Sequence, residues 1–354
     1  MMFFNNRPIG SASSSVEVEH DGLVLAMHES FCDFEADIKG AIPKALSNVY
    51  EMYITDTTHT VEQKTAVLEG VMGDAWEKIK AFFKKIAEKL KSWWNAALKY
   101  FQTIFSSNKS FLEKFKEDIS GKDGSKFSYT GYTYDSKKSG EVMKKVITAV
   151  KDAEGVFDRL SKLTDSEAEK VDENVKNEKK SIDKTWLGLI KDNVESGNVS
   201  KFKEALKKDW RGSKDKQEIK GFKKGLSVSE MITLMEDGGD MVTNLKEAAD
   251  NIASASEDYA DKVDNMVGKF RAREEDATKR ANYSKIVTGA STVAKYTLSY
   301  ATAALDVMKS ETQEMISQSS SVLRSFARYK SAKESYAPST GNHTSLLEAY
   351  AAGF

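Results

Sequence analysis

The chain is poor in cysteine, in proline and in net charge, and each shortage excludes a class of protein. A single cysteine, Cys32, excludes an internal disulfide and suits a reducing compartment. The three prolines (Pro8, Pro43 and Pro338) leave residues 44–337 without a helix breaker, which predicts a helix-rich fold. With 53 basic and 54 acidic residues, the chain has no global field that would draw it onto nucleic acid or an anionic membrane.

Long hydrophobic runs are missing as well. No stretch approaches the roughly 20 apolar residues of a membrane-spanning helix, and residues 1–15 lack the apolar core of a signal peptide. We therefore expect a protein that is made and used without export by the usual route. The 40% of apolar and 30% of charged residues suit long amphipathic helices with one apolar stripe. The predicted fold is mainly α, with long amphipathic helices that form bundles or helical hairpins.

Composition and periodicity divide the chain into five consecutive segments. They are a flexible arm (1–20), an N-terminal helical domain with a short β element (21–140), a polar helical connector (141–225), a long-helix bundle or hairpin (226–337) and a tail (338–354). The connector is assigned because apolar residues are sparse from Thr164 to Lys184, which indicates an exposed helix.

The clearest single element is an amphipathic helix from Asp74 to Phe105. Asp74 is a candidate N-cap, with Glu77 at the third helical position. Seven lysines against three acidic residues give this segment a net charge of +4. Its large apolar residues recur at spacings of three and four, so they share one face of the helix. We predict that this face makes the main interactions, through Trp76, Ile79, Phe83, Ile86, Leu90, Trp93 and Phe101.

Two roles are open for this apolar face. One is packing against neighbouring helices in a bundle or coiled coil. The other is contact with a lipid interface, where the aromatic residues insert and the lysines stay in water. The near-heptad spacing and the presence of Glu88 among the lysines favour packing. Phe82, Trp94 and Leu98 widen the face beyond a narrow seam and keep lipid contact as an alternative.

Further along the chain the pattern changes several times. Ser106–Asn108 indicates a break, followed by a short helix over Lys109–Ile119. Alternating aromatic residues from Lys126 to Tyr134 predict a short strand or a tight hairpin. Three glycines and a basic cluster place a boundary at residues 209–228. Two or three long helices are predicted from Ser229 to about Ser335.

Motifs for catalysis, cofactors or metals are scarce. His28-Glu29 begins like a zinc-protease motif, but Cys32 stands where the second histidine is needed. His20, His28 and Cys32 have helix-compatible spacing, yet a solvated histidine and a half-buried cysteine are the favoured interpretation. No phosphate loop or nucleophile motif occurs. We predict a non-enzymatic protein without catalytic, cofactor-binding or metal-binding residues.

Nucleic acid is not an expected partner. The stretch Lys201–Lys224 interleaves lysines with Trp210 and Phe222, as a nucleic-acid contact would. Four acidic residues dilute this stretch, so a solvated linker is the favoured interpretation.

The block from Trp76 to Tyr134 resembles a region of virion structural proteins of large contractile-tailed bacteriophages. In that family a Trp/Phe/Lys helix precedes an Asn-Lys-x-Phe-Leu helix and a Phe-x-Tyr-x-Gly-Tyr strand. The matching residues here are Asn108, Lys109, Phe111, Leu112, Lys114, Phe115, Ile119, Phe127, Tyr129, Gly131 and Tyr132. The resemblance covers about sixty residues. It implies a capsid-associated virion component, inside the head or in its assembly core, that is made in the host bacterial cytoplasm.

The same resemblance implies partners and a processing step. The expected partners are other virion proteins or further copies of the chain. Head proteins of T-even-like phages are trimmed after an aliphatic-x-Glu sequence, and Leu346-Leu347-Glu348 in the tail makes Glu348 a candidate for such processing. Two alternative functions stay open: a membrane-active protein that uses the helix 74–105, and a transient assembly scaffold.

Overall fold

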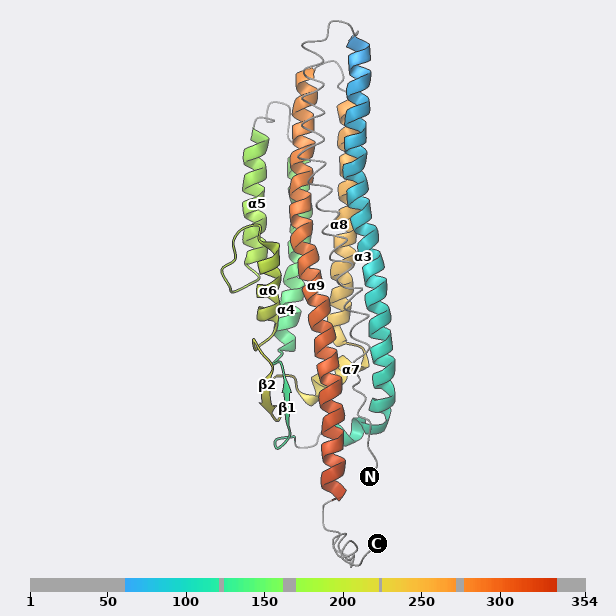
Figure 1. The fold of residues 1–354 in the computed structure, drawn as a ribbon, viewed down its shortest axis with the longest axis vertical. Coiled ribbons are helices and arrows are strands. Elements are labelled where there is room, and N and C mark those ends of the chain that lie inside the picture. Colours follow the sequence, from blue (N-terminus) through green and yellow to red (C-terminus); the bar gives the residue numbers. More distant parts are fainter. Residues whose placement is uncertain (1–60, 121–123, 162–169, 223–224, 272–276, 336–354) are drawn as a thin grey trace, which may run out of the picture. The chain divides into compact units, whose positions relative to one another are not determined.

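The computed structural model describes residues 61–120, 124–161, 170–222, 225–271 and 277–335. These residues form seven helices and two short strands, which confirms the mainly α fold (Figure 1). The predicted arm at 1–20 and the tail at 338–354 lie outside the described residues. None of the helices in the described ranges combines the length and the hydrophobicity that a bilayer span requires.

Helix α3 (Val61–Ile119) is longer than the sequence predicts. The N-cap assigned to Asp74 is wrong, because the helix begins thirteen residues earlier at Val61. The predicted break at Ser106–Asn108 is also wrong, because the helix continues to Ile119. Asn108 is buried, and its amide nitrogen donates to the carbonyl of Met235 at 3.4 Å. A residue type that is typical of turns therefore makes a tertiary contact in the middle of a helix.

The chain folds into two units, and each unit is assembled from three described stretches that are far apart in sequence. Unit 1 contains α3 up to Gln102, the segment Lys137–Trp210 and the segment Asp240–Thr312. Unit 2 contains the segments 103–136, 211–239 and 313–335. The units therefore do not follow the consecutive segments 21–140, 141–225 and 226–337, because periodicity along a chain does not say which distant helices pack together.

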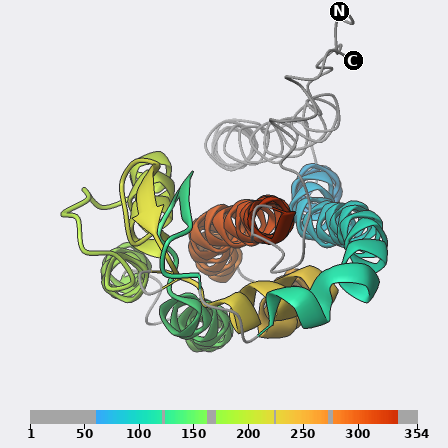
Figure 2. The same cartoon turned by 90° about the horizontal axis from the view of Figure 1, so that it is seen from below.

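Unit 1 is a helical bundle. It holds all of α5 (Val171–Leu187) and α6 (Val199–Trp210) and most of α4 (Ser136–Ser161) and α8 (Gly239–Arg271). The first part of α3 and the first part of α9 (Ala277–Ser335) complete the unit. In this unit α9 lies between α3 and the pair formed by α5 and α6 (Figures 1 and 2). Ring contacts of Tyr300 with Trp186 at 6.0 Å and with Phe202 at 5.1 Å join α9 to that pair. Helix α5 therefore packs through its end at Ile182–Trp186, while most of its earlier side chains are exposed or half-buried.

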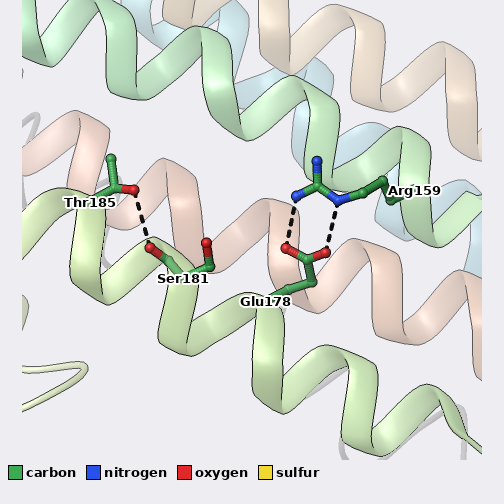
Figure 3. A network of polar contacts seen from close by, with 4 residues as sticks. All are labelled: Arg159, Glu178, Ser181 and Thr185. Atoms are coloured by element: carbon green, nitrogen blue, oxygen red, sulfur yellow. Dashed lines mark hydrogen bonds and ion pairs between the residues drawn. The ribbon is translucent and has the colours of Figure 1, made fainter.

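The bidentate pair between Arg159 of α4 and Glu178 of α5 holds these two helices together (Figure 3). Both N–H···O distances are 2.9 Å. Glu178 accepts both hydrogen bonds, and they raise the pKa of the Arg159 guanidinium above its ordinary value. A hydrogen bond of the Thr185 hydroxyl to the carbonyl of Ser181, at 3.1 Å, lies one turn further along α5.

Unit 2 combines the ends of two long helices with a two-stranded sheet. Strand β1 (Ser128–Gly131) confirms the short strand, and it pairs antiparallel with β2 (Gln217–Lys220) in the register Ser128↔Lys220. The tight hairpin alternative is wrong, because the partner strand comes from residues that read as a basic linker in the sequence. Helix α7 (Val228–Glu236) completes the unit and starts with a capping box between Ser227 and Glu230.

Candidate functional site

The seven residues predicted as the interaction face of α3 all lie inside unit 1. They are Trp76, Ile79, Phe83, Ile86, Leu90, Trp93 and Phe101, with relative exposures of 0–6%. Phe83 meets the ring of Tyr259 on α8 edge-on, with 5.6 Å between ring centroids. The ammonium group of Lys309 on α9 lies 5.2 Å from the centroid of a Trp93 ring. The apolar face of α3 is therefore occupied by protein, and its role in interactions with other molecules stays a prediction.

Two ion pairs border this packed face and join α3 to α8. Lys80 pairs with Asp264 at 2.8 Å, and Lys91 pairs with Glu257 at 2.5 Å. The hydrogen bond to Asp264 raises the pKa of Lys80 above its ordinary value. Since residue numbers on α8 fall as those on α3 rise, the two helices run antiparallel.

Helix α9 carries buried charges that no local sequence pattern indicates. Asp306, Lys309 and Glu311 are at most 5% exposed, although they lie close together on one helix. Asp306 forms an ion pair with Lys203 of α6, and Glu311 lies 3.7 Å from Lys207 of the same helix. Only the carboxylates of these pairs are buried, since the lysines are 37% and 44% exposed, but a packing that leaves a buried carboxylate without its cation is penalised. They therefore select the relative position of α6 and α9.

A second polar cluster lies between α5 and α9, around Asp183. The hydroxyl of Tyr296 donates to Oδ1 of Asp183 at 2.6 Å, and the hydroxyl of Tyr300 donates to the same oxygen at 2.8 Å. The Tyr300 oxygen in turn accepts the backbone N–H of Gly197 at 3.1 Å. Burial, followed by the bond to Asp183, raises the pKa of both phenols, that of Tyr300 to about 12. The cluster ties α5, α9 and the segment before α6 together.

The sequence contains a weak signal for this cluster. Asp183 falls beside Ile182 and three residues before Trp186, on the face of α5 that the apolar residues mark as buried. A carboxylate on an apolar face needs a donor partner, so its position predicts a buried hydrogen bond. Nothing in the local pattern says that Tyr296 and Tyr300, more than a hundred residues away, supply it.

The residues that carry the phage resemblance beyond residue 105 form much of the core of unit 2. Asn108, Phe111, Leu112, Ile119, Phe127 and Tyr129 are all buried there. The side-chain oxygen of Asn108 accepts hydrogen bonds from the Ser320 hydroxyl at 2.8 Å and from Arg324 at 3.3 Å. Phe127 stacks with Phe222 at 5.8 Å and meets Phe326 at 5.1 Å. In this chain the motif therefore builds the unit.

Gly131 has a specific function in this motif. The Gln318 side chain accepts from the backbone N–H of Tyr132 at 2.9 Å and donates to its carbonyl at 2.8 Å, so that an amide satisfies the backbone where β1 ends. A Cβ on Gly131 would lie 2.6 Å from the Gln318 oxygen. A glycine at this position therefore allows the close approach on which both bonds depend.

Some predicted residues lie outside the described part of the chain. These are His20, His28 and Cys32 of the metal alternative, and Glu348 of the predicted processing site. Within the described ranges, no group of three or more His, Cys, Asp or Glu side chains is arranged to hold a metal ion.

Comparisons of the chain with protein-family models, with curated proteins and with solved structures found no match.

Proposed function

We propose that this protein is a non-enzymatic structural component of a bacteriophage particle, located inside the head or in its assembly core. Its mechanism is helix–helix packing, in which a preformed bundle offers its outer surfaces to other copies or to other particle proteins. The resemblance at Asn108–Tyr132 supports the phage assignment, because those residues recur in virion proteins and here build a folded unit.

One structural observation supports packing over the lipid alternative. The aromatic and aliphatic face of α3 is already buried against α8 and α9, through Phe83–Tyr259 and Trp93–Lys309 among other contacts. Insertion of this face into a lipid interface would require α3 to leave both neighbours. The apolar surface of α8 and α9 that α3 covers would then be exposed to water, which costs about 25 cal/mol for each Å².

The test is mass spectrometry of density-purified particles of a phage that encodes the chain. Many copies per particle are expected, together with a peptide that ends at Glu348 if the tail is processed. Presence in the infected cell with absence from the mature particle would contradict the proposal. In that case, detection of the chain in immature heads would identify it as a transient scaffold.

A vesicle flotation assay with the purified chain tests the membrane-active alternative. We expect no flotation with vesicles that contain anionic lipids, because the apolar face of α3 is occupied. Flotation of the wild-type chain, kept in the exposed-position variant Lys84→Glu, would favour membrane activity instead.

A further inference from the structure

Strand β2 of unit 2 has an open edge. Six of the seven residues from Lys214 to Lys220 are exposed, and only Ile219 is buried. On its other side β2 pairs with β1, which lies between β2 and the C-terminal part of α9 (Figures 1 and 2). Where β1 ends, the amide of Gln318 on α9 bonds both backbone groups of Tyr132. Since α9 lies beside β1, the edge of β2 is the one that a further strand can join.

The ladder between the two strands shows which backbone groups of β2 point to the open edge. In an antiparallel ladder every second residue turns its N–H and C=O toward the partner strand, and the residues between turn theirs away. The N–H of Gly221 donates to the carbonyl of Phe127 on the β1 side at 2.6 Å, so Gly221 and Ile219 face β1. Glu218 and Lys220 therefore face the open edge. Within the described ranges, no residue bonds to the backbone N–H and C=O groups of these two.

A second copy of β2 fits this edge in one register. Two identical antiparallel strands form hydrogen bonds only where residues that face the edge stand opposite each other. Glu218 opposite Glu218 of the second copy, or Lys220 opposite Lys220, brings like charges together and is unfavourable. Glu218 opposite Lys220 brings opposite charges together, and symmetry forms this pair twice. Charge therefore selects the register in which Glu218 and Lys220 pair across the two copies.

This register also satisfies the backbone of the edge. Each pair of Glu218 with Lys220 exchanges two N–H···O bonds, so the backbone groups of both residues are used in both copies. Ile219 faces Ile219 of the second copy at the twofold axis. The two small sheets become one continuous sheet in the order β1-β2-β2-β1. A two-stranded sheet is marginal by itself, so each copy gains from the strands of the other.

We propose that a second copy of the chain docks on the open edge of β2, strand against strand, in the register that pairs Glu218 with Lys220. This contact goes beyond the helix packing of the proposed function and does not depend on the phage assignment. Backbone hydrogen bonds hold the two strands together, while the charge pairs select the partner strand and its register. Because the contact is one short strand with exposed charges, the dimer is reversible and weakens with salt.

Sedimentation velocity on the full chain, over a series of concentrations, tests the dimer. Glu218→Lys places two basic side chains opposite each other, and Lys220→Glu places two acidic ones. Each change should raise the dissociation constant about tenfold or more. The double variant Glu218→Lys with Lys220→Glu should return to the wild-type value, because opposite charges face each other again. Glu141→Lys is the matched control for Glu218→Lys, since it changes the charge equally at an exposed position of α4 and should leave the dimer intact.

Hydrogen exchange tests the backbone contact separately from the charges. The N–H groups of Glu218 and Lys220 should exchange more slowly as the protein concentration rises, whereas those of Ser128 and Thr130, at the other edge of the sheet, should not. A wild-type chain that stays monomeric at low salt would overturn the inference. So would a Glu218→Lys dimer as tight as that of the wild type, or a dimer without this protection. Each result would leave the virion proposal intact, because that proposal is decided by the composition of the particle.

Discussion

Tyr300 on α9 donates a hydrogen bond to Oδ1 of Asp183 on α5 at 2.8 Å, across 117 residues of sequence. Tyr296 donates to the same oxygen from one turn earlier on α9. The Trp186 ring stacks on that of Tyr300 with an interplanar angle of 9° and closes the cluster on its apolar side. The carboxylate of Asp183 is stable inside the bundle because two phenol hydroxyls replace the hydrogen bonds that water would donate.

Tyr300→Phe is expected to lower the free energy of unfolding by about 1–3 kcal/mol, since it removes a buried donor from Asp183 and leaves the N–H of Gly197 without its acceptor. Tyr296→Phe removes a bond to the same oxygen from a half-exposed residue, where water can take over, and should cost less. Urea titrations of the three chains compare these losses. Equal losses would show that burial does not set the strength of the two bonds.

Alkaline pH should release this cluster. The pKa of Tyr300 is raised to about 12, so the folded chain holds a proton that the unfolded chain gives up near pH 10. The stability from this protonated phenol is complete below pH 10 and is lost as the pH rises through about 12. The stability difference between wild type and Tyr300→Phe should therefore shrink above pH 10. A constant difference from pH 9 to pH 12 would argue against the raised pKa.

Gly289 on α9 and Gly268 on α8 should respond to alanine in opposite directions. A Cβ on Gly289 would lie 2.8 Å from Cγ1 of Val171 and 3.0 Å from Cγ2 of Val175, so α5 must move away. A Cβ on Gly268 meets nothing within 4 Å. Gly289→Ala is expected to cost about 1–3 kcal/mol through overpacking. Gly268→Ala should stabilise by about 0.5–1 kcal/mol through helix propensity, and thermal unfolding measures both changes.

The ion pair of Lys203 with Asp306 should behave as a coupled unit. Lys203→Met leaves a nearly buried carboxylate without its cation and is expected to cost about 3 kcal/mol. The double variant Lys203→Met with Asp306→Leu should recover most of this loss, because it removes the carboxylate that the single variant leaves without Lys203. A double-mutant cycle by denaturant unfolding measures the coupling. Additive losses would mean that the two side chains do not depend on each other.

A charge on the apolar face of α3 should unfold unit 1. Phe83→Glu places a carboxylate against Tyr259 at a position with 0% exposure, and a loss of about 3–5 kcal/mol is expected. Lys84→Glu, at the exposed neighbouring position, should change stability by less than about 0.5 kcal/mol. Circular dichroism during heating distinguishes the two variants. A stable, fully helical Phe83→Glu chain would contradict the packing of this face.

The limits of local pattern are clearest in α9 and β2. Carboxylates are usually exposed, yet Asp306 and Glu311 of α9 are buried because the helix has neighbours on several sides. Strand β2 has only one buried side chain, Ile219, and no alternation that would mark it as a strand. It becomes one because β1 supplies its hydrogen bonds. Both features depend on residues that lie far away along the chain.

The sequence by itself determined the helical class of this protein and the inner face of α3, because spacings of three and four residues require only the geometry of one helix. It also marked the small strand through its alternating aromatic residues. Only the tertiary structure decided that α3 continues through Asn108, that Asp183 meets two tyrosines and that the charges of α9 pair with α6. Those outcomes depend on partners more than a hundred residues away in sequence, and a carboxylate or an amide is stable inside a protein only where such a partner supplies its hydrogen bonds.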